Sequence, residues 1–268
     1  MYSGFLSPRH SSQWVGTHQK LNRISYHMAI EKIDNGVFPE IKTIQSFEGL
    51  NGPDGIKLKS PSQNEPWHYY DPLDDEDTQL IDLLDQHYVS LVKALKEHNM
   101  ERAGFEASWL SHGITDGLTP AHQYPYEKEL QNITGKHKDT RTTRGKKFFA
   151  GGETRPQRIK NNWKLWGMKG LMLTHQNFEI GVAAIAIPMR LKKFKLTEKE
   201  IEDAVSIGPT ELFKKSARNI ASYHMYDRFY RSGWNTTLGK DVRELLIPAI
   251  SKTVALSWLM PANEATDK

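Results

Sequence analysis

The 268-residue chain contains no cysteine. The lack of thiols excludes thiolate zinc sites, iron–sulfur clusters, a cysteine nucleophile and a disulfide framework. A chain of this length buries roughly 70–75% of the surface that its unfolded form exposes, so it does not need a structural metal in order to fold. Any bound metal would therefore be functional, and its ligands would have to be His, Asp or Glu.

Long hydrophobic runs are also missing. No run of 18 apolar residues occurs, so the sequence predicts no transmembrane segment. The longest apolar stretch, residues 180–189, is followed directly by Arg190 and is typical of buried core. The first residues have no apolar centre of the kind that a secretory signal needs. The sequence as given thus favours the cytoplasm, and we leave the localisation unassigned.

What the chain does contain is a near balance of charges. Its 36 Lys and Arg residues exceed its 32 Asp and Glu residues by four, and the isoelectric point is about 9.0. With 38% hydrophobic residues, the composition suits one folded domain or at most two. We expect a single α-helical domain over residues 1–268.

Apolar residues recur at helical spacing along most of the chain, which predicts an all-α fold. Residues 37–75, rich in Gly, Pro, Asn and Ser, are expected to form a long loop with at most short extended pieces. Residues 124–163 break the helical pattern and are expected to form an irregular insertion. The predicted helices cover about 15–33, 76–98, 100–117, 163–187, 196–206, 209–231 and 239–260.

The insertion is strongly basic. Between residues 136 and 169 there are eleven Lys or Arg residues against two acidic ones. Phe148, Phe149 and Trp163 could stack on bases or insert into lipid beside these charges. An anionic membrane surface and a single strand of nucleic acid would both attract such a segment, and a solvated loop without a partner is the third interpretation.

Histidine and acidic residues occur in pairs with the spacing of one helical turn. Chance predicts about one His-x3-Asp/Glu pair in this composition, and the chain has three. Each pair could place an imidazole nitrogen and a carboxylate oxygen on one metal ion. His27/Glu31 is interpreted as a surface pair. His112/Asp116 and His175/Glu179 are the candidate metal ligands.

More candidate ligands surround these pairs. His122 follows Asp116 by six residues, and His68 lies in a segment that reads Trp-His-Tyr-Tyr-Asp-Pro. His18 lies on the first predicted helix. Except for His68, all of these ligands lie on predicted helices or at their ends, so a helical bundle could gather them around several metal ions.

In its ordered set of ligands, the sequence resembles the zinc-dependent phospholipase C family, which is related to the zinc-dependent single-strand nucleases. The matching elements are a first-helix His (His18), an Asp and a His before the central helices (Asp54 and His68), His112-x3-Asp116-x5-His122, and His175-x3-Glu179. The resemblance implies a multi-helix bundle of this type with long loops, two or three zinc ions, and hydrolysis of a phosphodiester.

The resemblance also implies roles for single residues. His68, His112 and Asp116 correspond to ligands of one zinc ion, and His122, His175 and Glu179 to ligands of a second. His18 and Asp116 correspond to part of a third site, so that Asp116 bridges two metals. Asp54 corresponds to the acidic residue beside the attacking water, with Glu48 as the alternative acid.

The chain departs from the family pattern in two places. In the family, the amino group of an N-terminal Trp completes the third zinc site, and here Trp14 could do so only after cleavage behind Gln13. The final His-x3-Glu pair is preceded by the basic insertion, where the family has a short loop. Phospholipid is the first expected substrate. Single-stranded nucleic acid, or binding to nucleic acid or membrane without catalysis, are the alternatives, and the family's usual export is a further expectation.

Overall fold

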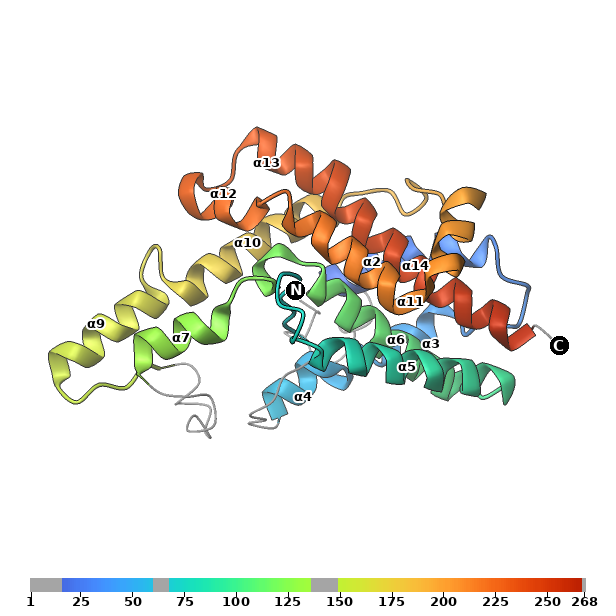
Figure 1. Cartoon of the computed structure of the whole chain (residues 1–268), viewed down its shortest axis with the longest axis horizontal. Coiled ribbons are helices and arrows are strands. Elements are labelled where there is room, and N and C mark those ends of the chain that lie inside the picture. The colour runs from blue at the N-terminus through green and yellow to red at the C-terminus, as the bar shows by residue number, and fades with distance from the viewer. Residues whose placement is uncertain (1–15, 60–67, 136–148, 267–268) are drawn as a thin grey trace.

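The computed structural model describes residues 16–59, 68–135 and 149–266. All regular structure in these ranges is helical, which confirms the predicted all-α class (Figure 1). The longest helices pack side by side as a bundle, and two shorter ones extend from it to one side.

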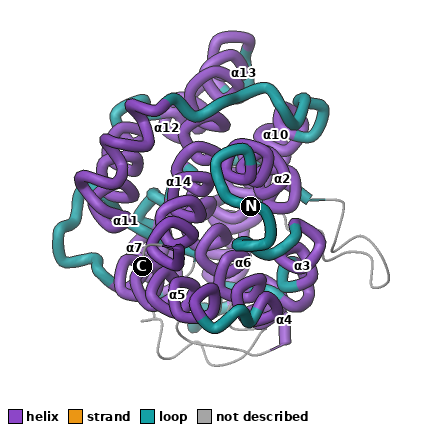
Figure 2. The backbone as a smooth tube through the Cα atoms, turned by 90° about the vertical axis from the view of Figure 1, so that its right-hand side faces the viewer, coloured by secondary structure: helices purple, strands orange, loops and turns teal. Residues whose placement is uncertain are grey.

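Helix α14 (Ile247–Thr266) lies at the centre of the bundle. It contacts α2 (Thr17–Ile30), α5 (Gln79–Lys96), α6 (Met100–Gly117) and α11 (Glu198–Ala221), which surround it in Figure 2. Its side chains Ile250, Val254 and Trp258 are completely buried. The Trp258 indole N–H donates a hydrogen bond to the backbone oxygen of Ala107, 2.9 Å away, and this bond ties α14 to the middle of α6.

By length and composition, the helical run Thr236–Thr266 is apolar enough to cross a membrane. However, 78% of its most hydrophobic window is buried inside the protein. A helix that forms the centre of a bundle must be apolar on most of its sides, so this composition is accounted for by its position.

Helices α5 and α6 position the middle of the site. Leu80, Leu84 and Leu91 form the buried face of α5, as their spacing predicts. Helix α6 begins at a capped end, where the Asn99 side chain accepts a hydrogen bond from a backbone N–H. Gly117 lets the two helices approach closely, because a Cβ atom there would lie 2.6 Å from a methyl carbon of Leu80.

The prediction of a loop over residues 37–75 was wrong in its first half. This stretch contains α3 (Ile41–Ser46), the 3-10 turn η1 (Gly49–Asn51) and α4 (Pro53–Lys59). Helices of one or two turns give too few repeats for a hydrophobic period to be visible, and they depend on tertiary packing. Here α3 packs against α6 and α2, and Pro53 suits the first position of α4.

The prediction of an irregular insertion over residues 124–163 was also wrong for the described part. Two helices lie there, α7 (Tyr126–Thr134) and α9 (Arg155–Trp166). They contact each other and the start of α10 (Leu171–Ala186), and they form the part that extends from the bundle in Figure 1. A small apolar cluster of Leu130, Ala150 and Leu165 holds this lobe together.

The boundaries of the later helices differ from the prediction for local reasons. The helix expected over residues 163–187 is divided between α9 and α10 at the segment 167–170, which has a glycine at each end. The break expected between residues 206 and 209 is present as a kink within α11 at Gly208, where φ is +77°. Helix α11 is followed by α12 (Met225–Ser232), α13 (Thr236–Asp241) and a π-helical turn (Val242–Leu246) that leads into α14.

Candidate metal centre

The structure brings all of the residues singled out as candidate ligands into one region. Helix α6 supplies two of them, α10 another two, and the remainder come from α2, α4, the segment before α5 and the 3-10 turn η2 (Pro120–His122). Three groups of side chains could each hold a metal ion. They are His18 with Glu48 and His112, Asp54 with His68 and His112, and His122 with His175 and Glu179.

Asp116 is completely buried and connects these groups. Its Oδ1 atom lies 3.1 Å from Nε2 of His18, and its Oδ2 atom lies 2.9 Å from Nδ1 of His68. Oδ2 is also 3.6 Å from Nε2 of His112 and 3.6 Å from Nδ1 of His122. One carboxylate thus has an imidazole on each side of it, which is the arrangement that a carboxylate shared by two metals requires.

His68 lies between two carboxylates. Its Nδ1 atom faces Asp116 and is 3.9 Å from Oδ1 of Asp54. Asp54 comes from the first turn of α4, where the sequence Gly-Pro-Asp-Gly resembles an ordinary turn, and its side chain is 16% exposed. Since one potential ligand atom each of Asp54, His68 and His112 lies within 4.8 Å of the others, Asp54 could bind a metal or orient water beside one.

The group of His122, His175 and Glu179 is more open. Oε1 of Glu179 lies 2.8 Å from Nε2 of His122 and 3.0 Å from Nε2 of His175. The side chains of His175 and Glu179 are 13% and 16% exposed. This group lies where η2 meets α10, at the base of the lobe that α7 and α9 form.

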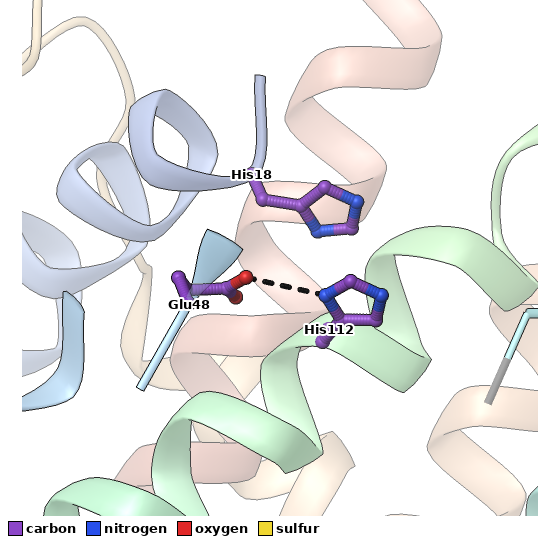
Figure 3. A group of neighbouring side chains, drawn as sticks. All are labelled: His18, Glu48 and His112. Carbon is purple, nitrogen blue, oxygen red and sulfur yellow. Dashed lines mark hydrogen bonds and ion pairs between the residues drawn. The ribbon is translucent and has the colours of Figure 1, made fainter. Parts of the chain in front are cut away.

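Glu48 is the partner that sequence reasoning did not assign. It is buried beside η1 and accepts a hydrogen bond from Nδ1 of His112 at 3.2 Å (Figure 3). It also accepts one from the Asn22 amide at 3.2 Å. The His18 ring stacks on the His112 ring with centroids 4.1 Å apart and planes 7° apart. The ring of His112 is therefore held from one side by Glu48 and from one face by His18.

Three acids that follow His68 in the sequence accept hydrogen bonds from groups other than the imidazoles. Asp71 accepts from the backbone of Leu73, Asp82 from Thr78 and Asp85 from Thr210. These acids lie close in sequence to His68. Glu48 is 64 residues away from His112 and reaches it only through the fold, so spacing gives no signal for it.

The outer hydrogen bonds select which ring nitrogen points into the site. The Nδ1–H group of His112 donates to Glu48, so its Nε2 atom faces Asp116. The Nδ1–H group of His122 donates to the backbone oxygen of His68, so its Nε2 atom faces Glu179. Metal-binding histidines usually have such an outer acceptor, because it fixes the tautomer and the orientation of the ring.

The electrostatics keep the carboxylates ionised. Burial alone would raise the pKa of Asp54, but His112 and His68 outweigh it and lower this pKa to about 2. Burial opposes ionisation of Asp116 and Glu179 as well. His122 and His18 lower the pKa of Asp116 well below its usual value, and His175 and His122 do the same for Glu179. Burial lowers the pKa of His122, which favours its neutral, ligand form.

The chemistry of these side chains fits a metal centre. Nδ1 of His18 and Nε2 of His112 are buried without a hydrogen-bond partner among the described residues. Unpaired buried polar atoms are unfavourable, and a bound cation would pair them. Ligand atoms about 2.0–2.1 Å from one tetrahedral zinc ion lie about 3.4 Å apart, near the 2.8 to 3.6 Å between these nitrogen and oxygen atoms.

Two tyrosines extend from the open group toward the lobe. The Tyr69 ring stacks on the His122 ring with centroids 5.3 Å apart, and the Tyr126 ring stacks on Tyr69 at 5.5 Å. Tyr126 belongs to α7, so this stack joins the lobe to the ligands. Trp14 and Phe148, for which the sequence suggested roles, lie outside the described residues.

Comparisons with known proteins give no relative for this chain. No protein-family model, no curated protein sequence and no solved structure matches it.

Proposed function

We propose that this protein is a zinc-dependent phosphodiester hydrolase with a phospholipase C-like site of two or three metal ions. The observation that carries the proposal is the position of Asp116, whose two oxygens face different imidazoles at 3.1 and 2.9 Å. A carboxylate in this position can bridge two neighbouring cations. A single-metal site would not require it.

The residues divide into sets around this carboxylate. His68, His112 and Asp116 would hold one ion, His122, His175 and Glu179 a second, and His18 with Asp116 part of a third. Bound zinc ions would polarise the phosphoryl oxygens of the substrate, lower the pKa of water from 15.7 toward about 7 and stabilise the charge on the leaving oxygen. His and carboxylate ligands also accept other first-row ions, so the choice of zinc rests on the family resemblance.

Asp54 would orient the water molecule that attacks the phosphodiester. Its low pKa keeps the carboxylate ionised at neutral pH, and its partial exposure leaves it open to solvent at the edge of the buried group. An ionised carboxylate in that place can orient a water molecule and accept its proton. Glu48 is an unsuitable alternative, because it is completely buried and accepts hydrogen bonds from His112 and Asn22.

Metal content and hydrolysis, measured together, test the proposal. Protein purified without chelator or added metal is expected to contain two or three zinc ions per chain and to hydrolyse bis(p-nitrophenyl) phosphate. Asp116→Asn and His175→Ala are expected to lose metal, and Asp116→Asn is expected to lose hydrolysis. Asp227→Asn is the control, since it changes an exposed Asp that lies 3.6 Å from His224 on the surface.

Two results would contradict the proposal. Full hydrolysis by Asp116→Asn would refute the bridging role. Less than one metal ion per chain, with no change in the variants, would refute the metal centre and favour a binding protein without catalysis. Phospholipid vesicles and single-stranded DNA, offered to the active protein, then decide between the two substrate classes.

A further inference from the structure

Helix α9 presents an apolar stripe to solvent. Asn161 and Leu165 form its buried side, and Ile159 and Trp163 lie about opposite them at a spacing of one helical turn. The side chains of Ile159 and Trp163 are 64% and 70% exposed. The opposite face of α9 packs against the lobe, so this row of large apolar side chains has no packing role within the protein. Such an exposed apolar row indicates a binding surface.

Basic residues flank this stripe on both sides. Arg155, Arg158, Lys160 and Lys164 are exposed on α9, and the helix contains no acidic residue. Arg155 and Lys160, together with Ile159 and Trp163, line a shallow hollow.

Two more exposed residues follow the end of the helix. Met168 is 86% exposed and is followed by the exposed Lys169. Helix α10 begins at Leu171, and the candidate ligand His175 lies one turn into it. The lobe extends from the bundle (Figure 1), so its tip is sterically accessible, and its base carries part of the metal centre.

We propose that this face of α9, with Met168 and Lys169, docks on an anionic lipid membrane. A helix with Trp and aliphatic residues on one stripe and Lys and Arg beside them is suited to the boundary between headgroups and acyl chains. The basic residues are attracted to anionic headgroups. A single nucleic-acid strand could bind to the basic residues and stack a base on Trp163. The exposed aliphatic side chains of Ile159 and Met168 would have no role in that binding, because they can neither stack on bases nor form hydrogen bonds with them.

Docking in this way goes beyond the proposed hydrolysis and does not require it. It can therefore be measured on metal-free protein, in which no substrate is turned over. Co-sedimentation is to be compared between vesicles of pure phosphatidylcholine and vesicles with roughly one third phosphatidylserine. We expect binding to the anionic vesicles, weak binding to the neutral ones, and loss of binding in about 1 M salt, where the screening length is about 3 Å.

Two double variants separate the contribution of the basic residues to vesicle binding from that of the apolar stripe. Arg155→Gln with Lys160→Gln is expected to weaken vesicle binding about thirtyfold, because each basic residue near an anionic surface contributes about fivefold. Ile159→Ser with Trp163→Ser is expected to leave only weak, salt-sensitive association. All four side chains are exposed, so the fold should be unchanged.

The matched controls lie on the bundle. Lys199→Gln with Lys215→Gln removes two exposed charges from α11, and Val89→Ser with Val205→Ser removes two exposed apolar side chains from α5 and α11. Both controls should bind vesicles like the unchanged protein.

Two outcomes would overturn the proposal. One is vesicle binding that is absent or that the α9 variants do not weaken more than the controls do. The other is binding of a single-stranded oligonucleotide, but not of vesicles, that the α9 variants abolish. Because vesicle binding is measured without metal, its failure would leave the hydrolytic proposal standing, and failed hydrolysis would leave the docking proposal standing.

Discussion

Two helices carry the same His-x3-acid pattern in very different surroundings. On α6, the side chains of His112 and Asp116 are 0% and 1% exposed, while on α10 those of His175 and Glu179 are 13% and 16% exposed. The α6 pair lies inside the bundle, next to the rings of His18 and His68. The α10 pair lies at the base of the lobe. Equal spacing in the sequence thus produced one pair inside the core and one at its edge.

Because the two pairs differ in burial, we expect them to differ in their contributions to folding and to substrate access. A buried carboxylate that faces four imidazoles is part of the core, so we expect its removal to affect folding as well as metal binding. The α10 pair is partly exposed and is reachable from solvent. A substrate would therefore be expected to approach from the α10 side, where the lobe also begins.

The largest expected effect comes from removing the two acids in turn. In metal-free protein, Asp116→Ala should lower the free energy of unfolding by about 3–5 kcal/mol, since it leaves buried polar groups without their partner. Glu179→Ala should lower it by about 1.5–3 kcal/mol, the range for a hydrogen bond to a charged group. Urea denaturation measures both values. Equal losses would show that burial does not distinguish the two pairs.

A smaller effect is expected from the outer partner of the α6 pair. Glu48→Gln keeps the size of the side chain but removes the charge that faces Nδ1 of His112. We expect zinc affinity, measured by chelator competition, to fall about 10–100-fold.

Glu106→Gln is the matched control for this change. Glu106 is also buried and has an oxygen 2.6 Å from Nδ1 of a histidine, His87, but it belongs to none of the metal-binding groups among the described residues. Its replacement should leave zinc affinity unchanged. If both variants lost affinity alike, the effect of Glu48 would be one of general stability rather than of ring orientation.

The titration of Asp54 should affect how the free energy of unfolding of the metal-free protein depends on pH. Its pKa is about 2 in the folded state and about 3.8 when unfolded, so its ionisation stabilises the fold above pH 4. This contribution of about 2 kcal/mol is lost as the pH falls from about 4 to about 2. Asp54→Asn should therefore be less stable at pH 6 and lose less stability on acidification. Parallel pH curves for both proteins would contradict the assignment.

The sequence was sufficient to predict a helix and its buried face where the apolar pattern repeats over several turns. The leucines of α5 recur over about four turns of one face, from Leu80 to Leu95, and this repetition predicted the helix and its buried side. Helices α3 and α4 have at most seven residues each, and α7 has nine, so their apolar positions do not repeat often enough to be recognised. They exist because the bundle or the lobe packs against them.

The same limit applies to the candidate site. The spacing predicted a shared helix face for His112 with Asp116 and for His175 with Glu179, and the structure has both pairs, 3.6 and 3.0 Å apart. Glu48 had been noted only as an alternative to Asp54, and its contact with His112 joins distant segments. The stack of Tyr69 on His122 likewise depends on how the segment before α5 folds back, which no local pattern encodes.

That stack provides the smallest expected effect and the finest test of the comparison. Tyr69→Leu removes a ring that supports His122 and contacts Tyr126 of α7, so we expect a loss of about 0.5–1.5 kcal/mol in unfolding free energy. His122 belongs to the open group, so zinc affinity there should fall by up to about tenfold while the buried group keeps its metal. Stepwise chelator titration resolves the two classes of ion. Loss of the buried metal instead would mean that the two groups form a single cooperative unit, because Asp116 lies 3.6 Å from His122 and could transmit the change.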